Sequence, residues 1–493
     1  MSRVGKPVAA AVFAACLAGC AVGPDYVRPE APQGVDGQAA FAEDGAWRAA
    51  MPAQPDPSQP WWAAYGDARL DALVAQAVAA NQTLAQAEAQ YRQAQALVQG
   101  ASAAFYPTVG ASAGGSRART VSSGVSKLGD SHAWSLSASW EPDLWGGVRR
   151  SVEAAQASAD ASGADLAAAQ LAVQAGVVNG YLQLRVLDRQ QALYERTIAA
   201  YRESLRLTQA QHRAGVATGA DVALAESTLA TAEAQAVDLG LSRRQLAHAL
   251  AVLVGRTPAG FSLPPEPQAD LPALPGVPPA LPSQLLERRP DIAAAERRVA
   301  AANAQIGVAQ AAYFPNLTLS ASGGNTGAGL GLASWAAAPG KVWALGAALA
   351  GTLFDGGARS ANVERARAAF DGTAAAYRQT VLAGFQEVED NLAALRDLRQ
   401  ELQAQQRAVT ASGQAERVAL SQYRAGTATY LGVITAQALS LNSQRAALQL
   451  QGREFAASVA LVKALGGGWQ AHPQADAQAK AQAQAAAGKE VQP

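Results

Sequence analysis

Apolar residues recur at alternating spacings of four and three positions in two long segments of the chain. The first segment runs from Val173 to Leu205, and the second runs from Val381 to Val409. A period of 3.5 residues is typical of helices that pack as coiled coils. The first pattern lies between Gly147 and Gly215, and the second lies between Gly357 and Gly426. Each pattern therefore predicts one helix about 100 Å long, at 1.5 Å per residue.

Shorter helical patterns follow each long one and are expected to return along it. In the first half they cover 220–253 and 283–312, and a proline-rich connector at 256–282 separates them. Clusters of proline interrupt helices, so this return is predicted as two stacked helices. In the second half the return would use 429–465 and, from the start of the chain, 68–104.

A period of two residues replaces the helical period in two other segments. Leucines and alanines at 317–321 alternate with threonine and serines, and Trp134, Leu136 and Trp140 alternate with serines. This alternation predicts strands within about 107–144 and 316–355, two in each, hence four per chain. The glycine- and serine-rich stretches 114–131 and 323–340 are expected to be the loops that join them.

One face of these strands is apolar and the other is small and polar. That arrangement is typical of a transmembrane barrel, although a soluble sheet packed on one face would also produce it. The apolar stretch 342–354 is too short for a membrane helix and contains two glycines. We expect a strand there, with outward side chains at Trp343, Leu345, Ala347, Leu349 and Leu353. Five of the nine tryptophans fall in the strand segments, where they would form interfacial girdles: Trp134, Trp140, Trp145, Trp335 and Trp343.

The two halves of the chain repeat one another. Three pairs of phrases recur in the same order, FYP with YFP, LWGGVR with FDGGAR, and QHRAGVAT with QYRAGTAT, at offsets of 208, 210 and 211 residues. Because the shared residues are aromatics, proline, glycine and arginine, we interpret them as two copies of one architectural unit.

Four strands cannot close a barrel, and an open sheet would expose unpaired backbone groups to lipid. Two copies of the chain would supply eight strands, and side chains would fill the interior of a barrel of that size. Three copies would supply twelve strands, wide enough for a lumen. The sequence therefore predicts a homotrimer.

The first twenty residues have the pattern of a bacterial secretory signal. Arg3 and Lys6 precede a short apolar run that ends in Leu-Ala-Gly-Cys, which resembles a lipobox. Cys16 would leave with a signal peptide at 1–19, so Cys20 would have no disulfide partner. We expect Cys20 to be lipidated and to anchor the mature chain. By the resemblance to a lipobox, Ala21 instead of Asp after the cysteine points to the outer membrane.

Composition argues against several other functions. The chain has 39 basic and 39 acidic residues, so its charge indicates no nucleic-acid partner. The four histidines fall in a predicted loop, a helix end, a helix and the tail: His132, His212, His248 and His472. They form no catalytic or metal-binding motif, so we expect no enzyme, no cofactor and no metal.

These motifs together resemble the lipoprotein branch of the TolC-like outer membrane factors. The resemblance runs from Cys20 to about Trp469 and includes ERRPDI with YFP, LWGG with FDGGAR, and two RAG turns. It implies a mainly α-helical fold with a membrane β part, in which a trimeric α-helical barrel in the periplasm is capped by a twelve-stranded transmembrane β-barrel. The implied partners are outer membrane lipid, a periplasmic adaptor and an inner-membrane resistance-nodulation-division pump.

The implied function is a passive exit duct for drugs or other small molecules. A duct for protein secretion, or a periplasmic lipoprotein scaffold without a pore, remains an alternative. The expected organisation is a signal peptide (1–19), a lipidated segment (20–67), a first repeat (68–255), the connector (256–282), a second repeat (283–469) and a disordered tail (470–493).

The resemblance also implies candidate residues for adaptor docking, for the periplasmic aperture and for structural motifs. The periplasmic tips, where an adaptor would dock, are Gly215, Val216, Ala217 and Thr218 with Gly426, Thr427, Ala428 and Thr429. Asp221 and Thr435 are candidates for the periplasmic aperture, although threonine in the second copy weakens the case for an acidic ring. Structural motif residues are Arg289, Pro290, Asp291, Pro107 and Pro315.

Overall fold

In a computed structural model, the described residues of the chain form long helices and one four-stranded sheet. The structure describes residues 22–30, 32, 60–266, 270–274, 289–329, 335 and 340–467. The signal peptide, Cys20 and the tail therefore lie outside the described residues, as do most of 31–59 and parts of the proline-rich connector. Two compact units divide the chain: the first is Met1–Glu30, Gln90–Gly163 and Ala294–Arg378, and the second is Ala31–Ala89, Ala164–Ala293 and Gln379–Pro493.

Helices of matching length confirm the internal repeat. Helices α4 (Gly147–Arg213) and α9 (Ala358–Arg424) each contain 67 residues, and α5 (Gly219–Leu253) and α10 (Tyr430–Ala464) each contain 35. Helices α3 (Gln82–Ala103) and α7 (Pro290–Ala311) each contain 22. The long helices predicted from the heptad pattern are thus confirmed; residues 283–288, predicted to begin the second return helix, are not described.

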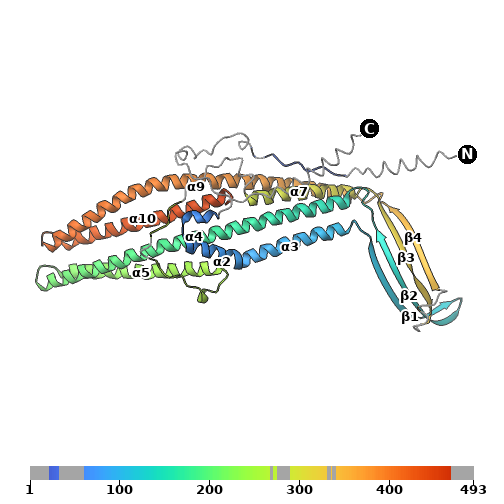
Figure 1. The fold of residues 1–493 in the computed structure, drawn as a ribbon, viewed down its shortest axis with the longest axis horizontal. Helices are drawn as coiled ribbons and strands as arrows, with labels where there is room; N and C mark the ends of the chain where they lie inside the picture. Colours follow the sequence, from blue (N-terminus) through green and yellow to red (C-terminus); the bar gives the residue numbers. More distant parts are fainter. Residues whose placement is uncertain are drawn as a thin grey trace. The chain divides into compact units, whose positions relative to one another are not determined.

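The heptad positions make the contacts that join each helix to its return. Tyr194, Ile198 and Tyr201 of α4 pack against Ala232 of α5. In the second copy Val388, Leu392 and Leu395 of α9 pack against apolar residues of α10, among them Leu450 and Leu461. Figure 1 shows α5 beside α4 and α10 beside α9. Burial of this apolar seam stabilises each antiparallel pair.

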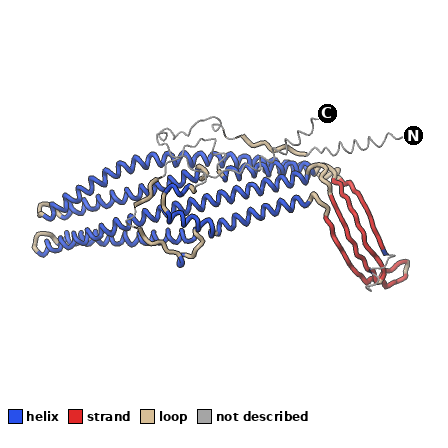
Figure 2. The backbone as a smooth tube through the Cα atoms, in the orientation of Figure 1, coloured by secondary structure: helices blue, strands red, loops and turns tan. Residues whose placement is uncertain are grey.

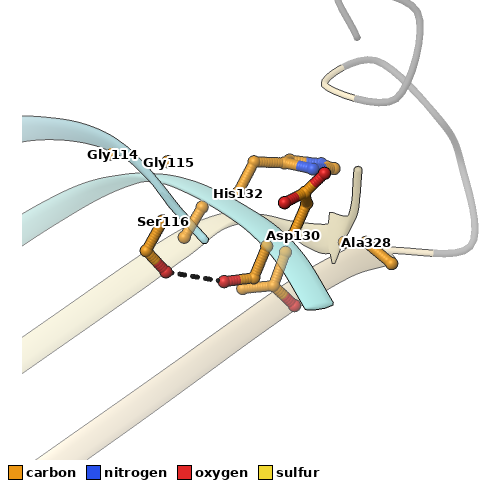
Figure 3. A pocket seen from close by; sticks show the side chains of 10 residues that line it. Gly114, Gly115, Ser116, Asp130, His132 and Ala328 are labelled. Carbon is orange, nitrogen blue, oxygen red and sulfur yellow. Dashed lines mark hydrogen bonds between the residues drawn. The ribbon is translucent and has the colours of Figure 1, made fainter. Parts of the chain in front are cut away.

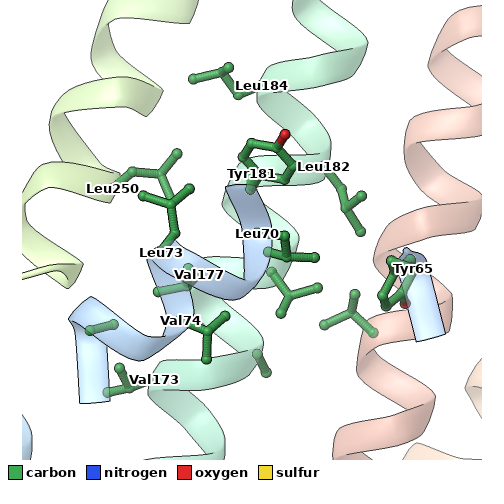
Figure 4. Packing of buried hydrophobic residues seen from close by; sticks show 14 of the residues in the cluster. Tyr65, Leu70, Leu73, Val74, Val173, Val177, Tyr181, Leu182, Leu184 and Leu250 are labelled. Atoms are coloured by element: carbon green, nitrogen blue, oxygen red, sulfur yellow. The ribbon is translucent and has the colours of Figure 1, made fainter. Parts of the chain in front are cut away.

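A second core surrounds α2 (Ala68–Ala80) and the short helix η2 (Trp61–Tyr65). Leu70, Val74 and other apolar residues of α2 are completely buried against Val177 and Leu182 of α4 and Leu250 of α5 (Figure 4). Tyr65, Val173, Tyr181 and Leu184 belong to the same cluster. This core joins the start of the chain to both of the helices that follow the first pair of strands.

Residues 68–104 are helical as expected, but they form two helices, α2 and α3 (Gln82–Ala103), because the helix breaks at Asn81. The Asn81 backbone is extended, with φ −70° and ψ 125°. Its side-chain oxygen accepts from the backbone N–H groups of Thr83 and Leu84, at 2.9 and 3.1 Å. Its amide donates to the Leu253 carbonyl oxygen at 2.8 Å. Asn81 therefore ends α2 and caps α3, and the partner at Leu253 stabilises the break.

The four strands form one antiparallel sheet in the order β1-β2-β3-β4 (Figure 2). Their bounds are β1 (Thr108–Ser122), β2 (Val125–Trp140), β3 (Asn316–Ala328) and β4 (Lys341–Ala350). The loop expected at 114–131 is wrong, because β1 and β2 pair through it to a turn at Ser123 and Gly124, and β3 likewise continues to Ala328. Positive φ at both turn residues, 52° and 77°, suits a two-residue hairpin.

Candidate functional site: sheet faces and hairpin tips

The strand register sorts the sheet into an apolar face and a small-polar face. Residues directly opposite one another in an antiparallel pair share a face. Leu136 lies opposite Gly323, and Leu317 lies opposite Leu349, whereas Ser137 lies opposite Ser322. The apolar face carries Val109, Ala111, Trp134, Leu136, Trp140, Leu317, Leu319, Trp343, Leu345 and Leu349. The small-polar face carries Thr108, Gly110, Ser112, Ser135, Ser137, Ser139, Thr318, Ser320, Ser322 and Gly346.

Large side chains on the apolar face are uncovered in a single chain. Trp343, Leu345 and Leu349 of β4 are 78%, 75% and 66% exposed. Leu353 was also expected on this strand, but β4 ends at Ala350, so Leu353 lies in the segment that leads to α9, where it is fully exposed. A monomeric soluble protein rarely exposes a continuous apolar face of this kind. The face therefore needs lipid or a protein partner.

The tryptophans divide into two groups. Trp134, Trp140 and Trp343 lie in strands, as predicted for a girdle. Trp145 instead precedes α4, where its indole stacks on Phe314 at 4.8 Å between ring centroids and donates to the Pro315 carbonyl oxygen at 2.8 Å. Trp335 also lies outside the strands. Packing with a neighbouring segment, and not strand alternation, determines the position of Trp145.

Pro107 and Pro315 mark the two junctions between helix and strand. Each follows a tight helical end, at Tyr106 and Phe314, and directly precedes β1 or β3. Trp140 donates to the Phe105 carbonyl oxygen at 2.9 Å, as Trp145 does at Pro315. The repeated aromatic-aromatic-proline phrase therefore supplies carbonyl acceptors that fix where each strand begins.

The distal end of the sheet holds a buried histidine. His132, expected in a loop, lies in β2 opposite Gly327, where a side chain would collide with its ring. Its Nδ1 donates to the Gly329 carbonyl oxygen at 2.7 Å, and the ring stacks on Trp335 at 5.2 Å. Figure 3 shows His132 and Asp130 on one side of the β1–β2 hairpin. The hydroxyl of Ser116 forms a hydrogen bond with the hydroxyl of Ser131 on the other side. His132 therefore contacts both Gly329 and Trp335, two described residues beyond the end of β3.

Arg289, in the ERRPDI motif, joins three helices of the second unit. The guanidinium is buried and donates two hydrogen bonds to the Asp291 carboxylate, at 3.0 and 2.7 Å. It also donates to Glu387 of α9 at 2.8 Å and to the Ala464 carbonyl oxygen, at the end of α10, at 3.1 Å. Pro290 is the first residue of α7, a position that needs no N–H donor. The motif thus connects the start of α7 to α9 and α10.

The first hairpin tip is the turn between α4 and α5. Gly215 has φ +77°, and the Val216 N–H bonds back to the Gln211 carbonyl oxygen at 2.9 Å. This is the hydrogen bond of a helix that ends in a left-handed glycine. Gly215, Val216 and Thr218 are exposed, and Ala217 is half-buried.

The second tip, between α9 and α10, has the same geometry. Gly426 has φ +73°, and the Thr427 N–H bonds to the Gln422 carbonyl oxygen at 3.0 Å. Gly426, Thr427 and Thr429 are exposed, and Ala428 is half-buried. Both tips therefore present small side chains to their surroundings.

Asp221 has a local structural role that the sequence analysis missed. Its carboxylate accepts from the Thr218 backbone N–H at 2.9 Å, and the Thr218 hydroxyl accepts from the Asp221 N–H at 3.2 Å. This reciprocal pair is a capping box, which the spacing T-x-x-D could have indicated. In the second copy Gly432 stands 211 residues on, and Thr429 caps α10 without a side-chain bond. Thr435 donates to the Leu431 carbonyl oxygen of its own helix.

Two tyrosines lie beside Asp221. Tyr423 and Tyr430 pack at 5.3 Å between ring centroids, in a cluster with Ala225 of α5. Burial, followed by neighbouring Tyr423 and Asp221, raises the pKa of Tyr430 to about 12. Burial also raises the pKa of Tyr423, whose protonated hydroxyl donates to Thr208 at 3.1 Å. These contacts join the two hairpins just above their tips.

The segment that follows Cys20 is bound to the helices, which no sequence signal indicated. Arg150 of α4 donates to the carbonyl oxygens of Val22 and Gly23, at 3.4 and 3.2 Å, and pairs with Asp25 at 2.8 Å. The Val22 N–H donates to the Trp145 carbonyl oxygen at 3.1 Å. Residues 22–25 are therefore held at the start of α4, which begins seven residues beyond the end of β2.

Within the described parts of the chain, no group of histidine, cysteine or acidic residues could hold a metal ion. None of the helices described here has the length and apolarity needed to cross a membrane.

Comparison with known proteins identifies the family. The model of the outer membrane efflux protein family matches residues 73–256 and 281–467, one match in each repeat. The chain is 35% identical to the pyoverdine export outer membrane protein OpmQ of Pseudomonas aeruginosa, over 88% of this chain and 93% of that protein. It is 33% identical to the toluene efflux pump outer membrane protein TtgC of Pseudomonas putida, over 95% and 98%. The solved outer-membrane channel OprN superposes with a TM-score of 0.83 at 31% identity, over 92% and 100% of the two chains. The chain therefore belongs to the outer membrane efflux protein family.

Proposed function

We propose that three copies of the chain form a passive exit duct through the outer membrane. The observation that carries this proposal is the sheet, which has one apolar face, one small-polar face and two open edges. An isolated sheet of this kind would leave edge N–H and C=O groups unpaired in lipid. Twelve strands from three copies pair every edge and enclose a lumen that the serines of the small-polar face would line.

The helices would continue this lumen into the periplasm, and the tips at 214–218 and 425–429 would contact a periplasmic adaptor. Support comes from the exposed small residues at both tips, which allow close approach of a partner helix. The adaptor would connect the duct to an inner-membrane resistance-nodulation-division pump. Asp221 is proposed to contribute to the aperture in addition to capping α5, and Thr435 of α10 is proposed as a second aperture residue.

Small molecules are the proposed cargo. The names of two relatives refer to export of pyoverdine and to efflux of toluene, and neither name refers to a protein cargo. A duct for protein secretion would use the same fold with another pump, and a scaffold without a pore would share only the helices. Purified protein that forms a heat-modifiable trimer and conducts ions in planar bilayers would support the duct. Monomers without conductance would contradict it.

Cysteine labelling tests the assignment of the two sheet faces. Cysteines introduced at Ser137, Thr318 or Ser320 are expected to react with a membrane-impermeant thiol reagent, because the small-polar face would line water. Cysteines at Leu136, Leu317 or Leu319 are expected to react at least tenfold more slowly, because lipid excludes the charged reagent. Mass spectrometry of the labelled trimers measures both sets, and denatured protein controls for thiol reactivity. Equal labelling of the two sets in membranes would refute the barrel.

Lipidation of Cys20 is a separate prediction. The docked segment at 22–25 would hold a lipid on Cys20 near the start of α4, which follows β2 by a short turn. Mass spectrometry of the mature N-terminus is expected to find diacylglycerol on Cys20. An unmodified chain that begins at another residue would contradict this. A Cys20→Ala variant with a conventional signal peptide should still reach the membrane fraction, at lower yield, because the barrel also inserts.

A further inference from the structure

The charges of the sheet are unbalanced, although the whole chain is neutral. Segments 108–140 and 316–350 contain four cations, Arg117, Arg119, Lys127 and Lys341, and one carboxylate, Asp130. All five residues lie toward the ends of the strands far from the helix junctions. Arg117 is four residues beyond Ala113, the partner of Trp134, which is about 13 Å along the strand. The cations thus follow the apolar band and would lie at headgroup level if the band spans lipid.

Three of the four cations lie on the apolar face. By register Arg117 and Arg119 share the face of Val109 and Ala111, opposite Asp130 and Leu128. Lys341 lies opposite Asn325, which lies opposite Trp134 of the same face. Lys127, opposite Thr120, lies on the small-polar face. Lys127 is therefore a natural control on the same hairpin.

The carboxylate offsets only part of this charge. Asp130 lies 3.4 Å from Arg117, whose side chain remains 65% exposed. Arg119 and Lys341 are exposed, and no acidic side chain among the described residues pairs with either. The face therefore presents an excess of positive charge level with Trp134, at Lys341, and just beyond it, at Arg117 and Arg119.

The trimer proposed above would bring these cations together. Because β1 and β4 are the two edges and run antiparallel, β4 of one copy can pair with β1 of the next. The apolar face carries the odd-numbered residues of both β1 and β4. The apolar faces of two copies are therefore continuous only if odd-numbered residues of β4 pair with odd-numbered residues of β1. Aligning Ala350 with Thr108 of the next copy puts Lys341 opposite Arg117 of that copy, and a shift of two residues puts it opposite Arg119. In either register three cations and one carboxylate meet at each seam.

We propose that each seam between copies binds the phosphate groups of an anionic glycolipid in the outer leaflet. The inference rests on the proposed trimeric duct. Directly opposed like charges destabilise a strand pair unless an anion lies between them. Guanidinium groups bind phosphate in a bidentate manner, and lysine contributes a point charge. Their position beyond the apolar band matches the headgroup layer and not the lipid tails.

Lipid binding to purified trimers tests the proposal. Trimers in neutral detergent are titrated with diphosphoryl lipid A, or with lipid A from which both phosphates have been removed, and native mass spectrometry measures bound lipid. The wild type is expected to prefer the phosphorylated lipid. The triple variant Arg117→Gln, Arg119→Gln, Lys341→Gln should bind it roughly 100-fold more weakly, given the usual contribution of each cation near a charged headgroup. Lys127→Gln should bind like the wild type.

Three results would overturn the proposal that the seams bind lipid phosphate. Unchanged binding by the triple variant, an equal loss in Lys127→Gln, or displacement of the lipid by the same concentration of inorganic phosphate would overturn the proposal. If the triple variant does not assemble, the variant Arg119→Gln, Lys341→Gln, which keeps the Arg117–Asp130 pair, should still bind at least about tenfold more weakly. A wild-type protein that is not trimeric would instead contradict the proposed duct, and its measured mass separates the two failures.

Discussion

Export is expected to fail in a variant with Gly215→Val and Gly426→Val, while trimers still assemble. Both glycines have φ above +70°, a region that β-branched residues avoid. Each valine would cost about 1–3 kcal/mol in that conformation, so both tips should adopt another shape. The sheet lies in the other compact unit, and its strands should pair normally. In a host whose only copy is the variant, a fluorescent efflux substrate should accumulate as it does without the protein.

The matched control places valine at Gly240 and Gly413, which lie within α5 and α9 of the same two hairpins. These glycines have no positive φ, and an added Cβ would contact only the flexible ends of Arg244 and Arg417. The control should export normally. If the tip variant forms normal trimers and also exports like the wild type, the turns are neither a required docking surface nor a required gate.

The largest loss of stability is expected when Arg289 keeps its charge but loses both carboxylate partners. In the variant Asp291→Ala, Glu387→Ala the guanidinium stays buried with only the Ala464 carbonyl as a partner. An unpaired buried charge typically costs about 3–5 kcal/mol. Arg289→Met should cost less, because it removes the buried charge and leaves two carboxylates that are 41% and 49% exposed to water.

Thermal unfolding in detergent, followed by far-ultraviolet circular dichroism, measures this order. The unfolding midpoint should be lowest for the double carboxylate variant, intermediate for Arg289→Met and highest for the wild type. Glu203→Ala is the control, since it removes a pair with Arg206 that is exposed on both sides and should leave the midpoint unchanged. If Arg289→Met unfolds at the lowest temperature, then packing of the arginine, and not pairing of its charge, is what the motif contributes.

Sequence patterns are sufficient where one periodic interaction dominates an element. The heptads of α4 and α9 predict their lengths closely, because every seam residue repeats the same packing and the first left-handed glycine ends the helix. Alternation at 134–140 and 317–321 predicts the two faces, because neighbouring residues of a strand point to opposite sides. The sequence alone therefore determined the repeat, the long helices, the reversals at both tips and the two-faced sheet.

Only the tertiary structure decided features that depend on a single distant partner. Asn81 breaks a helical pattern because the Leu253 carbonyl lies beside it. The glycine- and serine-rich stretch at 114–131 has weak strand propensity, yet it extends the hairpin through bonds such as Ser116 with Ser131 at 2.9 Å. Arg150 binds the segment at 22–25, although it does not stand out in the local pattern. The ERRPDI motif marks Arg289, but only the structure identifies its partners on α9 and α10. The physical reason is the same in each case: a polar group buried at a junction is stable only beside its partner, and a one-dimensional period carries no information about which distant residue that partner is.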